Sequence, residues 1–322
     1  MSIRLFGARS DEVIFRGGTG TFALLLIAIV GAIGVLLFNQ SLLSIEKFGW
    51  SFWTTDHWDP VLGDFGARPF IWGTLYSSIL ALIISTPIAL GIAIYVSELA
   101  PNWLRLPLVF LTELLAAIPS IVYGLWGIFV LVPVVRQLQV LTPDWMRDFS
   151  LFSGPPLGVG MLSAALVLAI MVIPFSSSVA REVLKSVPQA QREGAYALGA
   201  TRWEAIRMAL FYARTGIVGA VMLGFGRALG ETMAVTMVIG NNPQISWSLY
   251  APQYTMAAVL ANEFTEAADD LYLHALVEIG LVLFVITLII NVISRLFIWS
   301  MARQRQPRPV RTAVIPAAES AT

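Results

Sequence analysis

Long apolar runs separated by short polar segments dominate the sequence. We place six spans at 20–38, 69–97, 106–135, 156–180, 215–240 and 271–297. Each run reaches the roughly 18 residues that mark a membrane-spanning helix. Lipid offers backbone N–H and C=O groups no partners, so each run is expected to be a helix that satisfies its own backbone. The pattern therefore predicts an all-α, polytopic membrane protein with six transmembrane helices.

The spans divide the chain into three parts. We expect an N-terminal segment at 1–19, a transmembrane domain at 20–300, and a tail at 301–322 that is disordered beyond residue 305 because it is basic and then rich in Pro and Ala. The third run is too long for one crossing and contains Pro119. A tilt, a kink at Pro119 or an extension beyond the membrane must absorb the excess.

Composition supports the membrane assignment and narrows the chemistry. The chain is 57% hydrophobic and 12% charged, whereas soluble domains carry about 25% charged residues. It contains no cysteine, which excludes thiolate chemistry and disulfides, and its two histidines, His57 and His274, leave little for zinc sites. We assign no catalytic residue and no metal ligand. No small-residue cleavage site follows the first run, which we interpret as a retained helix.

Basic residues indicate the orientation. If the N-terminus is cytoplasmic, fifteen of the 20 Lys and Arg residues lie on the inside and four on the outside. Positive charge concentrates on the cytoplasmic side of membrane proteins. We therefore expect both termini in the cytoplasm, and the outer segments 39–68 and 241–270 on the opposite side.

One polar segment, 186–207, interrupts the apolar pattern on the inner side. Ser186 and Pro188 are start signals for a short helix. Gly199 suits the left-handed position after a helix, and Thr201 begins a capping box that starts a second helix. The segment is predicted to be a helix, a sharp bend and another helix, which is suited to rigid docking. An amphipathic helix on lipid headgroups remains the alternative.

Arg227 and Glu231 are charged residues inside the fifth span, one helical turn apart, so their side chains can meet on one face. Each charge costs about 2.5–3.5 kcal/mol at mid-bilayer, which makes such residues functional candidates. Arginine also binds phosphate oxygens in a bidentate manner. The alternative is structural, because Gly226 and Gly230 form a G-x-x-x-G pattern that favours close helix packing.

Other polar residues carry weaker signals. Glu113 is expected to be an interfacial or capping residue at the inner end of the third span. Glu278 lies near the outer end of the sixth span, where water can reach it, and has no assigned role. The hydroxyl groups of the second and fourth spans either join helices by hydrogen bonds or line an anion path.

The stretch "REGAYALGATRWEAI", 192–206, resembles the EAA loop of ATP-binding cassette (ABC) permeases. The matching positions are Glu193, Gly194, Ala195 and Gly199. Gly194 departs from the usual second residue, and Leu210-Phe211 replaces the Leu-Pro that commonly closes the motif.

Four further stretches resemble permeases of the PstC type, from the phosphate-specific transport (Pst) system. They are "ELLAAIPSIVYG" at 113–124, "MLGFGRALGETMAVTMVIGN" at 222–241, "LANEF" at 260–264 and "EIGLVLFVIT" at 278–287. The likeness runs in matching order from about residue 69 to 297. The chain is identified as similar to the binding-protein-dependent transport inner-membrane component family.

The resemblance implies a type I ABC-importer permease in the bacterial cytoplasmic membrane, with a cytoplasmic coupling helix. The implied partners are a PstA-type permease, a PstB-type ATPase dimer and an external PstS-type phosphate-binding protein, besides the lipid bilayer, and no nucleic acid. The implied ATPase-coupling residues are Arg192, Glu193, Gly194, Ala195, Gly199 and Thr201, and the implied substrate path contains Arg227 and Glu231.

No cofactor is expected on this chain, and ATP and Mg would be used by the partner ATPase. A Walker A loop needs Gly-Lys-Ser/Thr, but the two lysines, Lys47 and Lys185, follow Glu46 and Leu184. The chain is therefore predicted not to be an enzyme. A passive anion channel, a secondary anion carrier, or an ABC permease for sulfate or molybdate remain alternatives. An intramembrane enzyme is disfavoured, because neither H-E-x-x-H nor G-x-S-x-G occurs.

Overall fold

The computed structural model describes residues 7–303, with side chains from 15 to 301. The predicted disordered tail beyond 305 and the first six residues lie outside this range. The longer helices are α1 (Gly7–Phe48), α3 (Arg68–Ile94), α4 (Asn102–Ala117), α8 (Met161–Lys185), α10 (Arg202–Leu229) and α13 (Asp270–Arg303). The shorter helices are α2 (Ser51–Thr54), α5 (Ser120–Trp126), α6 (Val132–Leu141), α7 (Asp144–Arg147), α9 (Gln189–Ala197), α11 (Met233–Val238) and α12 (Met256–Glu263).

Two π-helical turns and one small hairpin complete the fold. The turns are η1 (Tyr95–Leu99), which continues α3, and η2 (Gly127–Leu131), which joins α5 to α6. The strands β1 (Trp58–Asp59) and β2 (Asp64–Phe65) pair antiparallel. Six helical stretches within the described residues are long and apolar enough to cross a membrane. The prediction of an all-α protein with six membrane helices is confirmed.

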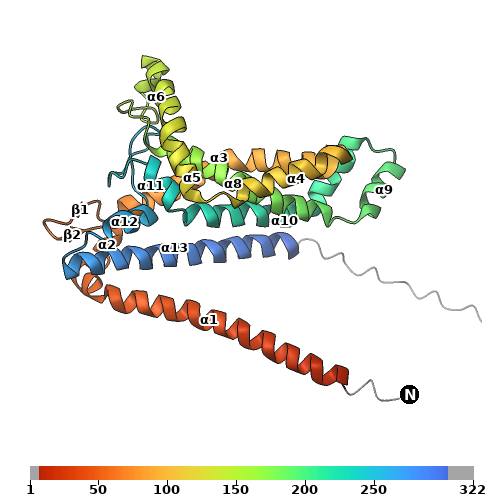
Figure 1. Ribbon diagram of the computed structural model, residues 1–322, viewed down its shortest axis with the longest axis horizontal. Coiled ribbons are helices and arrows are strands. Elements are labelled where there is room, and N and C mark those ends of the chain that lie inside the picture. The colour runs from red at the N-terminus through yellow and green to blue at the C-terminus, as the bar shows by residue number, and fades with distance from the viewer. Residues whose placement is uncertain (1–6, 304–322) are drawn as a thin grey trace, which may run out of the picture.

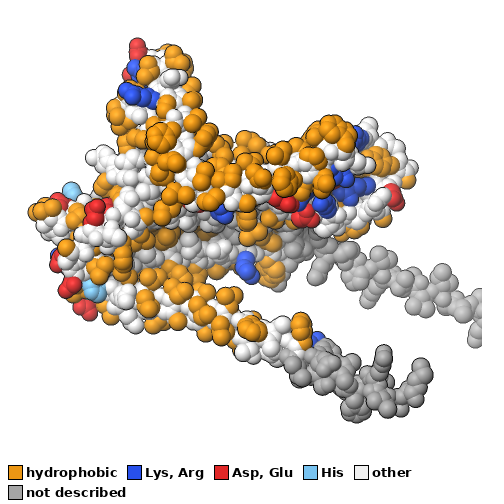
Figure 2. All heavy atoms as spheres, viewed as in Figure 1, with side chains coloured by type: hydrophobic (Ala, Val, Ile, Leu, Met, Phe, Trp, Pro, Cys, Tyr) orange, Lys and Arg blue, Asp and Glu red, His pale blue; other side chains and the backbone are white. Residues whose placement is uncertain are grey.

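The long helices lie lengthwise beside one another (Figure 1). The start of α1, the end of α13 and the short helix α9 all lie at one end of the molecule, while the hairpin, α2 and α12 lie at the other (Figure 1). We call these the α9 end and the hairpin end. Helix α6 projects away from the bundle (Figure 1). The face of α4, α5 and α6 in Figure 2 is covered by hydrophobic side chains, and charged side chains gather near the α9 end.

The third apolar run is two helical arms rather than one span. Helix α4 ends at Ala117, and Ile118 and Pro119 have extended backbones with ψ of 128° and 140°. A second arm of α5, η2 and α6 then continues from Ser120 to Leu141 and is itself long enough to cross. A proline disfavours helical geometry in the residue before it, which explains the break after Ala117. The expected single helix at 106–135 is wrong, and the kink at Pro119 is confirmed.

Two other boundaries differ from those predicted. Helix α8 begins at Met161 rather than 156, because Gly158 and Gly160 have φ of 81° and 155°, which no helix accepts. The fifth run is divided between two helices. Helix α10 starts at Arg202, before the apolar stretch, and the separate α11 contains the last part of the run. The expected helix at 215–240 is therefore wrong over its second half.

Small side chains set the packing of α3 against α8. Ala81 on α3 and Ala164, Ala165 and Ala169 on α8 are fully or almost fully buried. Small residues allow helix backbones to approach closely where lipid supplies no hydrophobic driving force. Thr74 Oγ1 on α3 accepts a hydrogen bond from Met256 N of α12, but three other buried hydroxyl groups do not join helices. Among the described residues their bonds run back along their own helix: Ser77 to Thr74 O, Ser85 to Leu82 O, and Ser177 to Pro174 O, at 3.1–3.4 Å.

An aromatic cluster closes the hairpin end. The ring of Phe65 stacks on Tyr272 at 5.4 Å, and Trp58 meets Phe70 edge-on at 4.9 Å. The indole of Trp58 and the hydroxyl of Tyr272 both donate to Oε2 of Glu263, at 2.8 and 2.7 Å. The cluster fastens the hairpin to α3, α12 and α13.

Candidate functional site

The polar segment at the α9 end has the predicted helix–bend–helix form. Gly199 follows α9 with φ of 81°, and the N–H of Ala200 donates to Ala195 O at 3.1 Å, which closes the helix end. Thr201 then begins α10 with a full capping box. Its N–H donates to Oε2 of Glu204 at 2.7 Å, and the N–H of Glu204 donates to its hydroxyl oxygen at 3.4 Å. The bend and the capping box are confirmed.

The predicted start of the first helix is wrong in detail. Ser186 does not cap α9, because its hydroxyl donates to Val183 O at 2.8 Å and so completes the end of α8. Pro188 precedes α9 in an extended conformation with ψ of 136°, instead of lying in its first turn. The proline therefore separates two helices and does not begin one.

The predicted coupling residues fall into two groups. Arg192, Ala195, Gly199 and Thr201 build the segment. Ala195 is buried, and Arg192 donates to the backbone carbonyls of Leu184 and Val187 at 3.0 and 2.8 Å. By contrast, Glu193 and Gly194 are exposed. A Cβ at Gly194 would meet nothing within 4 Å, so the departure from alanine has no steric cause within the described chain.

Three large side chains missed by the sequence reasoning share this exposed surface. Tyr196, Leu198 and Trp203 are 50%, 90% and 62% exposed. We call the surface of Glu193, Gly194, Tyr196, Leu198 and Trp203 the docking face. Large apolar side chains exposed close together in sequence are typical of an interaction site.

Arg227 and Glu231 do not share one helical face. Helix α10 ends at Leu229, Gly230 leaves the helix, and Glu231 lies in the loop before α11. Its Oε1 accepts a hydrogen bond from Ala234 N at 3.5 Å. No ion pair joins Arg227 and Glu231 in the part of the chain that the structure describes. The predicted pairing is wrong in this conformation, because the break at Gly230 removes the helical spacing.

Arg227 is exposed on the last turn of α10. Its guanidinium lies over the ring of Phe175 of α8, 5.8 Å from the centroid, which is a cation–π arrangement. The N–H donors of a guanidinium lie in its plane, so a ring over one face does not block them. Arg227 therefore presents donors on a face that this chain leaves uncovered.

The G-x-x-x-G pattern does not pack helices within this chain. A Cβ at Gly226 would meet nothing within 4 Å, and one at Gly230 would meet only its own helix, at Gly226 O. A close contact lies two residues before Gly226. A Cβ at Gly224 would collide with the hydroxyl oxygen of Ser176 and lie 2.9 Å from Val172 Cγ1. Gly224 therefore sets the approach of α10 to α8.

A buried arginine was missed because the sequence placed it in an inner loop. Arg181 of α8 has a side chain only 7% exposed, and its Nη2 lies 2.9 Å from Glu182 and 3.4 Å from Glu113 of α4. The Nε and Nη1 atoms of Arg181 have no hydrogen-bond partner among the described residues. Glu113, expected to be an interfacial or capping residue, forms an ion pair between two helices.

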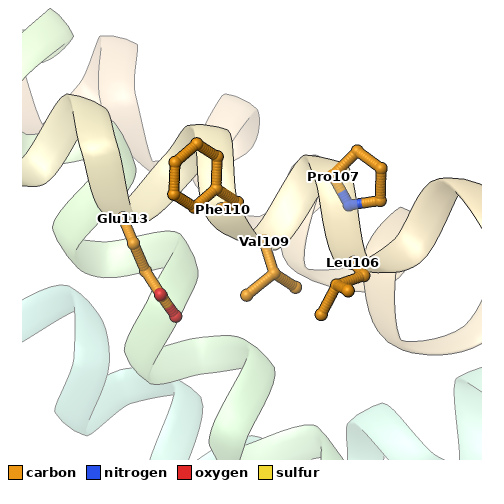
Figure 3. A pocket seen from close by; sticks show the side chains of 5 residues that line it. All are labelled: Leu106, Pro107, Val109, Phe110 and Glu113. Carbon is orange, nitrogen blue, oxygen red and sulfur yellow. The ribbon is translucent and has the colours of Figure 1, made fainter.

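Figure 3 shows Glu113 at one end of a groove of about 500 Å³ along α4, together with Leu106, Pro107, Val109 and Phe110. No residue of α4 is buried within this chain. An apolar helix face with one carboxylate is thus left open to lipid or to another protein.

Glu278 is buried, contrary to the prediction that water can reach it. Its side chain is 2% exposed on α13, and its Oε2 has no hydrogen-bond partner among the described residues. Glu278 borders a pocket of about 300 Å³ whose other lining residues are apolar or glycine, such as Phe38 of α1 and Trp53 of α2.

Comparisons with known proteins agree with this geometry. Residues 85–303 match the family described as "Binding-protein-dependent transport system inner membrane component". The chain is 48% identical over 310 residues to a Haemophilus influenzae protein called "Phosphate transport system permease protein PstC", covering 94% of this chain and 98% of that protein. It is 47% identical over 290 residues to a Mesorhizobium japonicum protein of the same name, covering 88% of this chain and 89% of that protein.

A solved structure shares the fold. The inward-facing MetNI methionine ABC transporter contains a chain that superposes with a TM-score of 0.54 at 14% identity, covering 72% of this chain and 94% of that chain. The residues matched by the family, 85–303, include the polar segment at the α9 end. The chain is a multi-pass membrane protein that belongs to the family of binding-protein-dependent transport system inner membrane components.

Proposed function

We propose that this chain is a membrane-spanning permease subunit of an ATP-driven importer that moves inorganic phosphate into the cytoplasm. The observation that carries the proposal is the near full-length likeness to proteins named phosphate transport system permeases. The docking face and the uncovered face on which Arg227 is exposed support it, because a permease needs one surface that binds the ATPase and another that contacts the substrate.

The proposed partners follow from what the chain leaves incomplete. ATP hydrolysis is placed on a separate ATPase dimer, which binds the docking face. A second, PstA-type permease covers the open face around Arg227 and α4, and a PstS-type phosphate-binding protein delivers substrate at the hairpin end. In this arrangement the α9 end and both termini are cytoplasmic, and the protein lies in the bacterial cytoplasmic membrane.

Transport is proposed to occur by alternating access. ATP binding closes the ATPase dimer and draws α9 of both permeases inward, which opens the path at the hairpin end. Phosphate then enters from the binding protein and rests briefly at Arg227. Hydrolysis resets the helices and opens the inner side. Weak binding at Arg227 suits this role, because an exposed guanidinium interacts with an anion through water-screened charge and releases it easily.

The experiment is reconstitution of the purified chain, alone and with its candidate partner subunits, into vesicles loaded with or without ATP. We expect phosphate uptake only when the ATPase, the second permease, the binding protein and ATP are all present. Uptake by the chain alone would support a passive channel or a secondary carrier. ATP-driven uptake of sulfate or molybdate in preference to phosphate would keep the importer and replace its substrate.

A further inference from the structure

We call the polar segment 186–207 the coupling segment. Glu98 holds it through a largely buried ion pair with Arg192. Its Oε1 lies 2.6 Å from Nη2 of Arg192, and its Oε2 accepts from Nε of Arg192 at 3.3 Å. The two side chains are only 11% and 22% exposed. Two parallel N–H···O bonds fix direction as well as distance, which a single contact does not do.

The same residue is bound a second time from beyond the bend. Nη2 of Arg202, the first residue of α10, donates to the backbone carbonyl of Glu98 at 2.8 Å. One residue at the end of α3 therefore receives bonds from both helices that flank Gly199.

A π-helical turn places Glu98 in reach of both arginines. In η1 the backbone forms i→i+5 bonds, as from Ala100 N to Tyr95 O at 2.7 Å, and the chain then leaves in an extended conformation. Such turns in α-helices occur frequently at functional sites. The wider turn changes the direction of the side chain at Glu98 relative to a continuous α-helix.

The ion pair, rather than apolar packing, holds this side of α9. A pocket of about 400 Å³ lies beside it, lined by polar residues that include Arg105, Gln189 and Glu193. Space next to the pair leaves α9 without a filled core on that side. Movement of α9 would therefore reach α3 through the pair, together with the bond from Arg202 to Glu98 O.

The opposite end of α3 is bound to the outer loop. Trp72 Nε1 donates to Ser246 O at 3.0 Å, and the hydroxyl of Tyr76 donates to Trp247 O at 2.8 Å. The N–H of Met256, at the start of α12, donates to Thr74 Oγ1 at 2.9 Å. Helix α3 is thus tied at one end to the coupling segment and at the other to residues 246–256.

We infer that Glu98 is a positioning residue through which α3 carries the movement of the coupling segment to the outer loop. The inference rests on the proposed function, because it needs a motor that moves α9. In this view the ATPase changes the hairpin end by shifting one rigid helix, with Glu98 and Arg192 as the connection at its inner end.

The test uses the assembled transporter and the absence of cysteine from this chain. An environment-sensitive fluorophore is attached at Gln244→Cys, an exposed position in the outer loop, with partner subunits whose own cysteines have been replaced. The signal is the fluorescence change on adding a non-hydrolysable ATP analogue, measured beside phosphate uptake and the amount of ATPase that copurifies.

Glu98→Gln removes the charge and keeps the shape. We expect the nucleotide-dependent signal and uptake to fall about tenfold, within the range usual for coupling between sites, while the ATPase copurifies as before. Glu182→Gln is the matched control. It breaks ion pairs with Arg181 and Lys185 on the same side of the molecule, and is expected to leave the signal unchanged.

An unchanged signal in an assembled Glu98→Gln transporter overturns the inference. If that variant does not assemble, Glu98→Asp replaces it, since it keeps the charge but is one methylene shorter. A reduced signal with Asp supports the inference and a full signal refutes it. A wild-type transporter with no nucleotide-dependent signal and no ATPase bound would instead refute the proposed function.

Discussion

The hydroxyl of Tyr123 on α5 donates a hydrogen bond of 2.8 Å to the backbone carbonyl of Leu115 on α4. The bond crosses the break at Ile118 and Pro119, and so fixes the angle between the two arms of the third apolar run. A carbonyl in the last turn of a helix lacks a regular helical partner, and this side chain supplies one.

Tyr123→Phe removes this bond and leaves the ring in place. We expect a loss of about 1 kcal/mol in the free energy of unfolding, the usual net value of one hydrogen bond, seen as a lower Tm in detergent. Tyr95→Phe is the control, because Tyr95 is 42% exposed and no described residue bonds to its hydroxyl. Equal Tm values for the two variants would show that the Tyr123 bond does not stabilise the break.

Gly224→Ala tests the contact between α10 and α8. The added methyl group would collide with Ser176, and overpacking of this kind costs about 1–3 kcal/mol. Gly226→Ala, two residues later, meets nothing within 4 Å and is expected not to lower stability. Melting of both variants in the same detergent makes the comparison, and Ser176→Ala, which removes the colliding hydroxyl, should recover part of the loss in the Gly224→Ala background. If Gly226→Ala lowered the Tm more than Gly224→Ala does, the assigned contact would be wrong.

Glu263→Gln tests the aromatic cluster at the hairpin end. Oε2 of Glu263 accepts from Trp58 and Tyr272, and bonds to a charged group are worth about 1.5–3 kcal/mol each. The amide keeps the shape but carries no charge, so we expect a clear drop in Tm. Glu266→Gln, at an exposed position three residues on, serves as the control. A similar small change in both would mean that the charge of Glu263 contributes little.

Arg227→Ala tests the transient anion site. We expect phosphate uptake to fall by about tenfold or more at equal membrane expression, because alanine removes both the positive charge and the planar fork that bind phosphate oxygens. Arg227→Lys is expected to retain part of the activity through charge alone. Arg68→Ala, which removes an exposed pair with Asp56, is the control. Near-normal uptake by Arg227→Ala would discard the site.

Leu198→Asp tests the docking face. Leu198 is 90% exposed, so the substitution is expected to leave the Tm of the isolated chain unchanged while sharply reducing copurification of the ATPase. Leu62→Asp at the hairpin end, at a residue 79% exposed, controls for the added charge. Loss of the ATPase with the control variant, or full recovery with Leu198→Asp, would contradict the assigned surface.

The sequence pattern was sufficient for features set by local chemistry. Apolar length predicted six membrane helices, and Gly199 and Thr201 predicted the bend and the capping box, because backbone dihedrals and caps depend on a few adjacent residues. It did not predict the pairs Glu98–Arg192 or Glu113–Arg181. Their members are 94 and 68 residues apart, and only the tertiary packing brings them together.

Periodicity also failed at Glu231. A spacing of four residues brings side chains together only if the helix continues, and the pattern around Gly230 contains no proline or polar run that would end it. The resemblance in "GRALGE" implied a site at Arg227 and Glu231, which stays a prediction, and the helix end at Leu229 places the two residues on separate elements.

The π-helical turn at Tyr95–Leu99 makes the length of α3 matter as much as its composition. A π-helical turn accommodates one residue more than the corresponding turn of an α-helix. Removing one residue before Glu98 would allow a regular helix, in which the carboxylate would no longer point in the direction that meets both arginines. A one-residue deletion in this turn is therefore expected to impair transport even if the helix itself still forms.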